Sequence, residues 1–334
     1  MKAGEDKLVQ GIAKALAFRS NGRLALGAGD DAALLTPRSG FEIILTCDWF
    51  LEGSHFLHRM HPPDSVGWKC LARAVSDIAA MGGRPACFLL SLAVPKSVLS
   101  SEKGWTAGWL DQFLRGLRRA AQRFGCVLAG GDTTRSRQIL ISLTVIGEVP
   151  TGLAIRRSGA KPGDKIFVSG TLGQADLGLQ ILRCGARISS QNDPSLRKHL
   201  YPEPRLALGQ WLARRKLASS MMDISDGLSS DLARLCAASR VGARMEAAQI
   251  PLPRMPAAGS KRRFDALDLA LNGGDDYELL FTVGQKNVAR IPRSLQGIAL
   301  TEIGEITRDR RLMIAERGKP TKPLVPHGWD PFRK

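Results

Sequence analysis

The sequence predicts an α+β protein of two domains. Its 334 residues are enough for two hydrophobic cores. Apolar runs of strand length are mixed with amphipathic helical segments, without the strict strand-helix alternation that accompanies a parallel sheet. A turn-rich stretch at residues 158–164, with Gly159, Pro162 and Gly163, divides the chain. We therefore expect an N-terminal domain at residues 1–155 and a C-terminal α+β domain at residues 156–334.

The elements of the first half follow from short apolar runs and helical spacing. Residues 42–47 predict a buried strand that ends at Asp48. Residues 66–81 predict a helix with apolar side chains on one face, and the glycine pair at 82–83 ends it. The remaining elements expected in this half are a strand at 86–94, a helix at 105–124 closed by Gly125, and strands at 127–129 and 139–149.

The second half begins with a predicted strand at residues 165–169. A glycine-punctuated loop at 170–173 leads into a helix that begins near Gln174, and residues 204–215 predict another helix. Asp226 has the character of an N-cap, because a carboxylate accepts the free N–H groups of a first helical turn and an apolar helical face follows it. Residues 279–283 predict a further strand.

The composition narrows the function classes. Hydrophobic residues make up 44% and charged residues 24%, as in a globular protein, and no apolar run is long enough to cross a bilayer. No apolar signal core follows the charged first residues. The six cysteines are scattered without a CxxC pair, which disfavours zinc sites and disulfides and fits a reducing compartment. We expect a cytoplasmic protein without a membrane partner.

The net charge of +17 allows two interpretations. A basic protein gains affinity for nucleic acid by displacing counterions from phosphates, and a basic surface equally attracts small polyphosphates. The lysines and arginines are dispersed, with no basic tail, zinc-finger spacing or aromatic RNA-binding signature. The second interpretation is favoured, so we expect no specific nucleic-acid partner.

Aspartates beside glycines or at predicted strand ends are the informative feature. Taken singly, each Gly-Asp pair is explained as a turn, because Asp bonds local backbone and Gly takes positive φ. Taken together they indicate a cation site, because converging carboxylates repel one another unless a cation neutralises them. Mg²⁺ binds through carboxylates and substrate phosphates. The positions are Asp30, Asp31, Asp48, Asp132, Asp223, Asp226, Asp275 and Asp276, with Asp77 late in the helix at 66–81. No GxxxxGK[ST] loop and no protein-kinase signature is present.

These motifs, in this order, resemble those of the thiamine-monophosphate kinases. The resemblance covers roughly residues 27–329, and the ordered set is specific although each motif alone is not. The segments that carry it are Gly27-Ala28-Gly29-Asp30-Asp31-Ala32-Ala33-Leu34-Leu35, Thr46-Cys47-Asp48, Glu52-Gly53-Ser54-His55-Phe56, Ser76-Asp77-Ile78-Ala79-Ala80-Met81-Gly82, Gly130-Gly131-Asp132-Thr133-Thr134, Arg157-Ser158-Gly159-Ala160, Asp223-Ile224-Ser225-Asp226-Gly227 and Tyr277-Glu278-Leu279.

The resemblance implies a fold, an activity and partners. It implies the two-domain aminoimidazole-ribonucleotide synthetase-like fold, in which the N-terminal domain binds ATP and metal and forms a homodimer through a shared β-barrel. It implies phosphorylation of thiamine monophosphate by ATP, assisted by several Mg²⁺ ions. The acceptor phosphate is already ionised at neutral pH, so catalysis needs positioning and charge neutralisation, and we expect no catalytic nucleophile or essential general base.

The resemblance also implies roles for individual residues. The expected magnesium ligands are Asp30, Thr46, Asp48, Asp77, Asp132, Asp223 and Asp226. The expected ATP contacts are Gly131, Asp132, Arg157 and Ser225. The expected contacts to thiamine monophosphate are His55, Asp275 and Trp329.

Some positions depart from the family pattern or allow another interpretation. Cys47 stands where the family usually has a hydroxyl residue, and Asp275 stands where many members have Glu. His55 also suits a purely structural role, and Trp329 suits either packing or stacking on a cationic ring. Rival functions are aminoimidazole-ribonucleotide synthetase and selenophosphate synthetase, although the latter carries an N-terminal reactive cysteine and no cysteine precedes Cys47.

Overall fold

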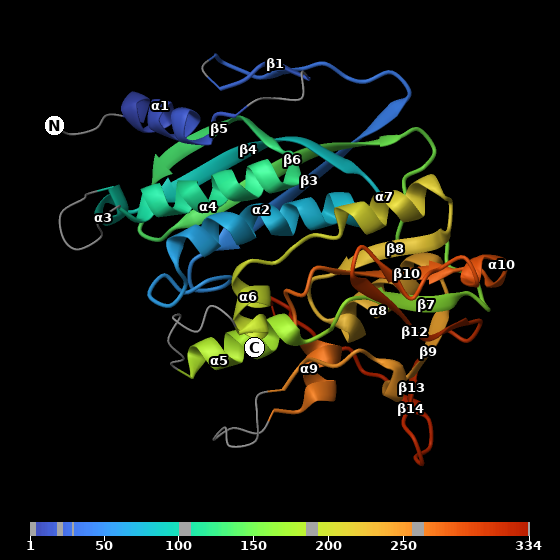
Figure 1. The fold of residues 1–334 in the computed structure, drawn as a ribbon. Helices are drawn as coiled ribbons and strands as arrows, with labels where there is room; N and C mark the ends of the chain where they lie inside the picture. The colour runs from blue at the N-terminus through green and yellow to red at the C-terminus, as the bar shows by residue number, and fades with distance from the viewer. Residues whose placement is uncertain are drawn as a thin grey trace. The chain divides into compact units, whose positions relative to one another are not determined.

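The chain folds into two compact units (Figure 1). The first comprises residues 1–78 and 83–152, and the second comprises residues 79–82 and 153–334. A computed structural model of the chain describes residues 5–18, 23–28, 30–99, 108–184, 193–255 and 264–332.

The first unit is built on a sheet whose described strands have the order β3-β6-β4-β5. These strands are β3 (Phe41–Leu51), β4 (Arg84–Val94), β5 (Val127–Arg135) and β6 (Leu140–Pro150). β6 is antiparallel to β3 and to β4, whereas β4 and β5 are parallel. A small ribbon of β1 (Leu24–Leu26) and β2 (Leu34–Leu35) precedes them. None of the described strands closes this sheet into a barrel.

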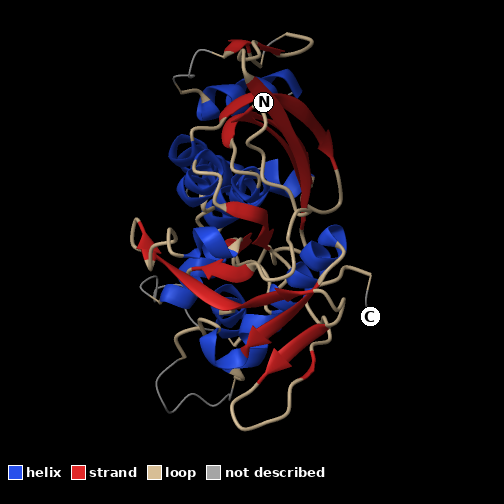
Figure 2. Cartoon of the chain, turned by 90° about the vertical axis from the view of Figure 1, so that its right-hand side faces the viewer, coloured by secondary structure: helices blue, strands red, loops and turns tan. Residues whose placement is uncertain are grey.

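Helices α2 (Pro63–Ala80) and α4 (Trp109–Phe124) lie side by side against one face of this sheet (Figures 1 and 2). Their contact depends on glycine, because a Cβ added at Gly116 would lie 1.8 Å from the Asp64 carbonyl oxygen. A Cβ at Gly67 would lie 2.0 Å from the Phe113 carbonyl oxygen. α1 (Glu5–Leu16) packs beside α4 and β5, and α3 (Lys96–Leu99) precedes α4.

The other face of the edge strand β3 is apolar and exposed. The side chains of a strand alternate between its two faces. Ile44 and Phe50 are buried on the helix side, whereas Ile43, Leu45 and Trp49 are 44%, 69% and 56% exposed. The unit therefore presents a row of large apolar side chains along one edge of the sheet.

The second unit contains a larger mixed sheet. Its described strands have the order β14-β13-β9-β12-β7-β10-β8, and β11 pairs with β12. All described pairs are antiparallel except β9 with β13. The strands are β7 (Lys165–Ser169), β8 (Ala218–Ile224), β9 (Gly242–Glu246), β10 (Glu278–Val283), β11 (Ser294–Leu295), β12 (Ile298–Thr307), β13 (Leu312–Ala315) and β14 (Lys322–Pro323).

Two cores lie on opposite faces of this sheet. Leu280 of β10 packs in the core that contains Leu228 and Leu232 of α8 (Leu228–Ser239). Phe281, the next residue, packs in the core that contains Leu212 of α7 (Leu206–Arg214). The remaining helices are α5 (Gln174–Arg183), α6 (Pro194–Leu200), η2 (Ala247–Gln249), α9 (Ala266–Asn272) and α10 (Gln285–Val288).

The α+β class and most predicted elements are confirmed. The strand at residues 165–169 has the predicted bounds, and Gly125 closes α4 with a left-handed φ of 67°. The predicted strand end at Asp48 is wrong, because β3 continues to Leu51. Asp226 is not the N-cap of α8: Gly227 holds that position. The predicted helix at 105–124 begins at Trp109 in the structure, and residues 105–107 of that prediction lie outside the described residues.

No helix among the described residues is both long and apolar enough to span a bilayer. All six cysteines lie in the described ranges and are free thiols.

Candidate active site

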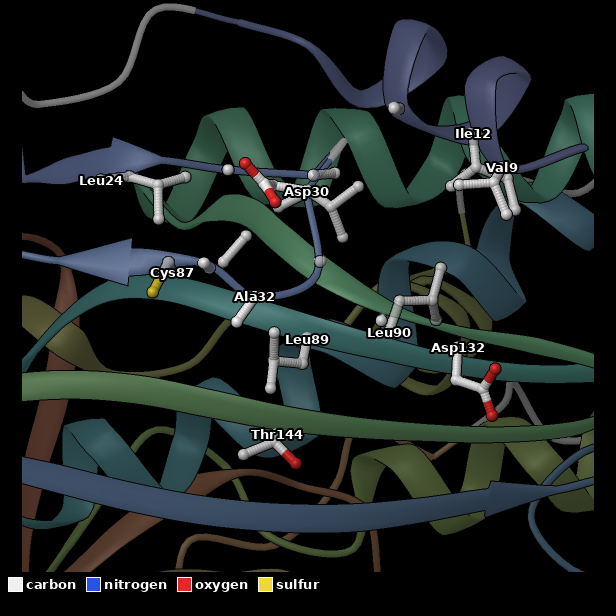
Figure 3. Close-up of a pocket in the computed structure, with 18 of the residues that line it drawn as sticks. Val9, Ile12, Leu24, Asp30, Ala32, Cys87, Leu89, Leu90, Asp132 and Thr144 are labelled. Atoms are coloured by element: carbon white, nitrogen blue, oxygen red, sulfur yellow. The ribbon is translucent and has the colours of Figure 1, made fainter. Parts of the chain in front are cut away.

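A pocket of about 630 Å³ in the first unit contains two of the predicted ligands, Asp30 and Asp132. Its walls come from α1, the segment around β1 and β2, and strands β4, β5 and β6. Figure 3 shows Val9 and Ile12 of α1 lining it, with Asp30 on the segment between β1 and β2 and Asp132 on β5. The pocket therefore combines an apolar wall with carboxylates from two elements.

The backbone at Gly131 explains how β5 brings Asp132 to this pocket. A Cβ at Gly131 would lie 1.9 Å from the Leu90 carbonyl oxygen of β4, so only glycine allows the two strands to approach this closely. The register between β4 and β5 shifts just before, between Phe88 and Leu89. Asp132 is consequently an exposed residue inside a strand, where the sequence had indicated a turn.

A second group of predicted ligands lies on the helix side of the sheet. The Thr46 hydroxyl donates to the Asp77 carboxylate at 2.5 Å. Asp48 follows Thr46 by two residues on β3 and so projects from the same face. Asp77 sits in the last turn of α2, where the helix dipole disfavours a carboxylate. Three of the predicted magnesium ligands therefore share one face of the sheet.

The oxygen donors suit Mg²⁺ in kind, because it prefers carboxylate and hydroxyl ligands. Within the described residues, however, no three or more His, Cys, Asp or Glu side chains form a group that could hold a metal ion. The chemistry of these residues fits a magnesium site, and each group of ligands by itself is incomplete.

His55 lies in the turn that follows β3. Its Nδ1 accepts the Leu51 backbone N–H at 3.0 Å, and its ring centroid is 5.8 Å from that of Phe50. Because Nδ1 is an acceptor, the neutral ring carries its proton on Nε2. The turn therefore fixes both the tautomer and the orientation of the imidazole.

In the second unit, backbone bonds bring Ser225, Asp226, Asp275 and Trp329 together. The Trp329 N–H donates to the Asp226 carbonyl and the Asp275 N–H donates to the Ser225 carbonyl, both at 2.8 Å. Gly328 makes this approach possible, because a Cβ there would lie 2.1 Å from the Asp226 carbonyl oxygen. These four residues were predicted as ATP, metal or substrate contacts. They lie together in the structure, where β8 ends and β10 begins.

Asp231 holds this turn in place, and the sequence analysis had missed it. Its side chain has no exposed surface, and one carboxylate oxygen accepts the N–H groups of Ser225 and Asp226 at 3.0 Å each. Arg234 donates to both Asp226 and Asp231 at 2.6 Å. Burial, and next the charge of Asp226, raise the pKa of Asp231 to about 6, against the opposing effect of Arg234. An acidic residue on the apolar face of the predicted helix, between Leu228 and Leu235, was the available signal.

Two further buried carboxylates flank Tyr277. Asp276 accepts the N–H groups of Gly173 (2.5 Å) and Ala175 (3.0 Å), at the start of α5. Burial raises the pKa of Asp276 to about 7, although Lys198 and these backbone donors oppose it. Burial would also raise the pKa of Glu278, but Lys198 and Arg205 outweigh it and lower that pKa to about 2. These carboxylates are structural, which the sequence could not distinguish from ligands.

Arg157 stands apart from that turn, whereas Asp223 lies two residues before Ser225 near the end of β8. The Arg157 carbonyl accepts the Ser239 hydroxyl at 3.1 Å, at the C-terminal end of α8, whereas Ser225 precedes the N-terminal end. A helix of this length spans about 18 Å, so the structure does not bring the Arg157 backbone to Ser225. Asp223 lies inside β8, paired with Leu279, and is only 4% exposed.

Comparisons with known proteins cover both units. Residues 29–149 match the N-terminal domain, and residues 161–315 the C-terminal domain, of the AIR synthase related protein family. The thiamine-monophosphate kinase of Escherichia coli strain K12 is 38% identical over 312 residues, which are 92% of each chain. The crystal structure of thiamine-monophosphate kinase from Stenotrophomonas maltophilia K279a is similar with a TM-score of 0.79 and 35% identity, covering 96% of this chain and 98% of that one. AaThiL complexed with AMPPCP and TMP has a TM-score of 0.74 at 31% identity, covering 99% of both.

Proposed function

This chain belongs to the thiamine-monophosphate kinase family, and we propose from that membership that it transfers the γ-phosphoryl group of ATP to thiamine monophosphate. The products are thiamine diphosphate and ADP. The observation that carries the proposal is the identity of 38% over 92% of the chain.

Phosphate is the acceptor in this reaction, so the residues need not activate a hydroxyl group. A phosphate monoester is largely ionised at neutral pH, and the remaining difficulty is to align two polyanions. We assign no nucleophile and no essential general base to the chain. Its residues bind and orient the two substrates.

Several Mg²⁺ ions are the cofactors under this proposal. Asp30, Thr46, Asp48, Asp77 and Asp132 would hold them in the first unit, and Asp223 and Asp226 in the second. The chemistry that these ions supply is neutralisation of phosphate charge and alignment of phosphate oxygens. The hard oxygen donors of both units support this assignment.

Nucleotide binding is assigned to Gly131, Asp132, Arg157 and Ser225. The pocket beside Gly131 and Asp132 supports the first two, because it is large and combines an apolar wall with polar groups. Arg157 suits a phosphate because its guanidinium group donates as a fork. Ser225 is held beside Asp226 by the carboxylate of Asp231.

Binding of thiamine monophosphate is assigned to His55, Asp275 and Trp329. Trp329 is 48% exposed and its indole offers a face for the cationic ring of thiamine. Asp275 offers a carboxylate beside the same turn. The fixed Nε2–H of His55 offers a donor.

The N-terminal domain, residues 1–155, would bind ATP and metal and form a homodimer whose two sheets make a shared barrel, and the C-terminal domain would be residues 156–334. The exposed row of Ile43, Leu45 and Trp49 supports the dimer, because exposed apolar patches mark interaction sites. Leu45→Lys should then give a monomer by light scattering. The free cysteines fit a cytoplasmic location.

The test is a coupled assay of product formation with Mg²⁺, ATP and one of three acceptors. We expect thiamine diphosphate from thiamine monophosphate, little product from free thiamine, and none from an aminoimidazole-ribonucleotide precursor. Equal turnover of free thiamine, or turnover of the aminoimidazole precursor alone, would overturn the proposal.

A further inference from the structure

The segment that carries Asp275 has a strained backbone. Asp275 and Tyr277 have φ values of 69° and 50°, in the left-handed region that L-residues other than glycine, asparagine and aspartate rarely enter. The cost at Tyr277 is about 1–2 kcal/mol, whereas an aspartate such as Asp275 enters this region more readily. Backbone strain of this kind persists only where the surrounding structure imposes it, and it is concentrated at functional sites.

Two buried carboxylates impose this conformation. Asp276 is tied to the start of α5 through the N–H groups of Gly173 and Ala175. Glu278 is tied to Ser169, Lys198 and Arg205. On the other side, the N–H groups of Asp275 and Tyr277 donate to the carbonyls of Ser225 and Ile224, both at 2.8 Å. The segment is therefore held from both sides.

The side chain of Tyr277 makes a hydrogen bond to Asp275, two residues earlier in the chain. The Tyr277 hydroxyl donates to Asp275 Oδ1 at 2.7 Å, while the residue as a whole is only 2% exposed. Asp176 of α5 packs against the same turn, since a Cβ at Gly273 would lie 3.2 Å from Asp176 Oδ2. Burial, and also the charge of Asp275, raise the pKa of Asp176, so the two carboxylates repel each other. The Tyr277 hydroxyl therefore bonds Asp275 beside another carboxylate.

We propose that Tyr277 is a positioning residue: its hydroxyl fixes the Asp275 carboxylate in the orientation in which it receives thiamine monophosphate. The inference rests on the proposed function, because it takes Asp275 as a substrate contact. A cationic ligand gains most from a carboxylate that is already oriented, because no side-chain entropy is lost on binding. Tyr277 thereby determines affinity for the acceptor and not for ATP.

The test is Tyr277→Phe, which removes the hydroxyl and keeps the buried ring. The matched control is Tyr201→Phe, since Tyr201 and Tyr277 are the two tyrosines of the chain. We expect the KM and the calorimetric Kd for thiamine monophosphate to rise about tenfold in Tyr277→Phe, as loss of a hydrogen bond to a charged group implies. The KM for ATP and kcat should stay within about twofold of the unchanged protein, as should every constant of Tyr201→Phe.

A double-mutant cycle with Asp275→Asn separates positioning from a general effect on stability. If Tyr277 acts through Asp275, Tyr277→Phe should not weaken acceptor binding further in a chain that already carries Asp275→Asn. A lower Tm with an unchanged KM for thiamine monophosphate, or fully additive effects on its Kd, would overturn the inference while leaving the kinase assignment intact. Absence of turnover and of acceptor binding in the unchanged protein would overturn both.

Discussion

Glu278 offers a sharp test of how the second unit is held together. Its carboxylate is 1% exposed and accepts bonds from Ser169 Oγ (2.5 Å), Arg205 Nε (2.6 Å) and Lys198 Nζ. Burial opposes ionisation, yet the two cations lower its pKa from 4.5 to about 2. That lowering corresponds to roughly 3 kcal/mol, and removing one partner from a buried ion pair typically costs about 3–5 kcal/mol. Glu278→Gln should therefore destabilise the unit by about 3–5 kcal/mol.

Chemical and thermal unfolding at neutral pH measure this loss, which should lower Tm on the order of 10 °C. Glu316→Gln is the control, because Glu316 also pairs with two cations, but these are the exposed Lys319 and Lys322, and ion pairs at the surface add little stability. A loss below about 1 kcal/mol in Glu278→Gln, or an equal loss in both variants, would refute the reasoning.

The unchanged protein and the Glu278→Gln variant should also differ in a defined way with pH. A carboxyl whose folded pKa is lowered contributes stability above its unfolded pKa and loses it as pH falls through the folded one. The stability advantage of the unchanged protein over Glu278→Gln should be constant above pH 4.5 and should shrink as the pH falls from 4.5 toward 2. An advantage that grows on acidification would show that the carboxylate is not ionised in the folded protein.

The remaining predictions concern packing, metal binding and charge. Gly116→Ala should lower the free energy of unfolding in urea by about 1–3 kcal/mol or more, because the new Cβ would overlap a carbonyl oxygen of α2. The control is Gly11→Ala, where the new Cβ would have no atom within 4 Å, so this variant should be neutral or slightly stabilising. Asp48→Asn and Asp132→Asn should each lower turnover by about 100-fold or more and weaken Mg²⁺ binding in calorimetry, with an unchanged circular dichroism spectrum, whereas Cys47→Ser should retain activity. Raising ionic strength should increase the KM for ATP a few-fold through screening, and duplex DNA should bind weakly, without sequence preference, in salt-titrated anisotropy.

The fold class followed from the sequence because hydrophobic periodicity is a local property. The strands at β4, β7 and β10 are short apolar runs between turn residues, and each was predicted close to its true bounds. The order of strands in the sheet could not be predicted from the sequence, because β7 pairs with β10 and β12, which lie more than a hundred residues later in the chain. Such pairings depend on the complete core and not on any local window.

The candidate site was predictable in residue type and only partly in arrangement. Glycine beside aspartate indicated turns, but Asp132 lies within β5, because Gly131 serves the close approach of two strands and not a reversal of the chain. Asp226 was expected to cap α8, but its carboxylate pairs with Arg234 and Gly227 takes the cap position. In both cases a contact outside the local window decided the outcome: Leu90 lies about forty residues before Gly131, and Arg234 lies eight residues after Asp226.

The adjacent residues Asp275 and Asp276 show why a sequence motif alone does not distinguish a ligand-binding carboxylate from a structural one. Asp275 and Asp276 are the same residue type at adjacent positions, yet Asp275 is partly exposed and Asp276 has no exposed surface. The difference comes from the start of α5, about a hundred residues earlier in the chain. The backbone N–H groups of Gly173 and Ala175 there donate to the carboxylate of Asp276. Asp276 is fixed there and Glu278 is fixed by Lys198 and Arg205, and the residues beside them, Asp275 and Tyr277, have positive φ values of 69° and 50°. The buried carboxylates of Asp276 and Glu278 thus determine the orientation of the Asp275 carboxylate. A substitution at Asp276 or Glu278 should therefore alter binding of thiamine monophosphate, although neither side chain contacts it.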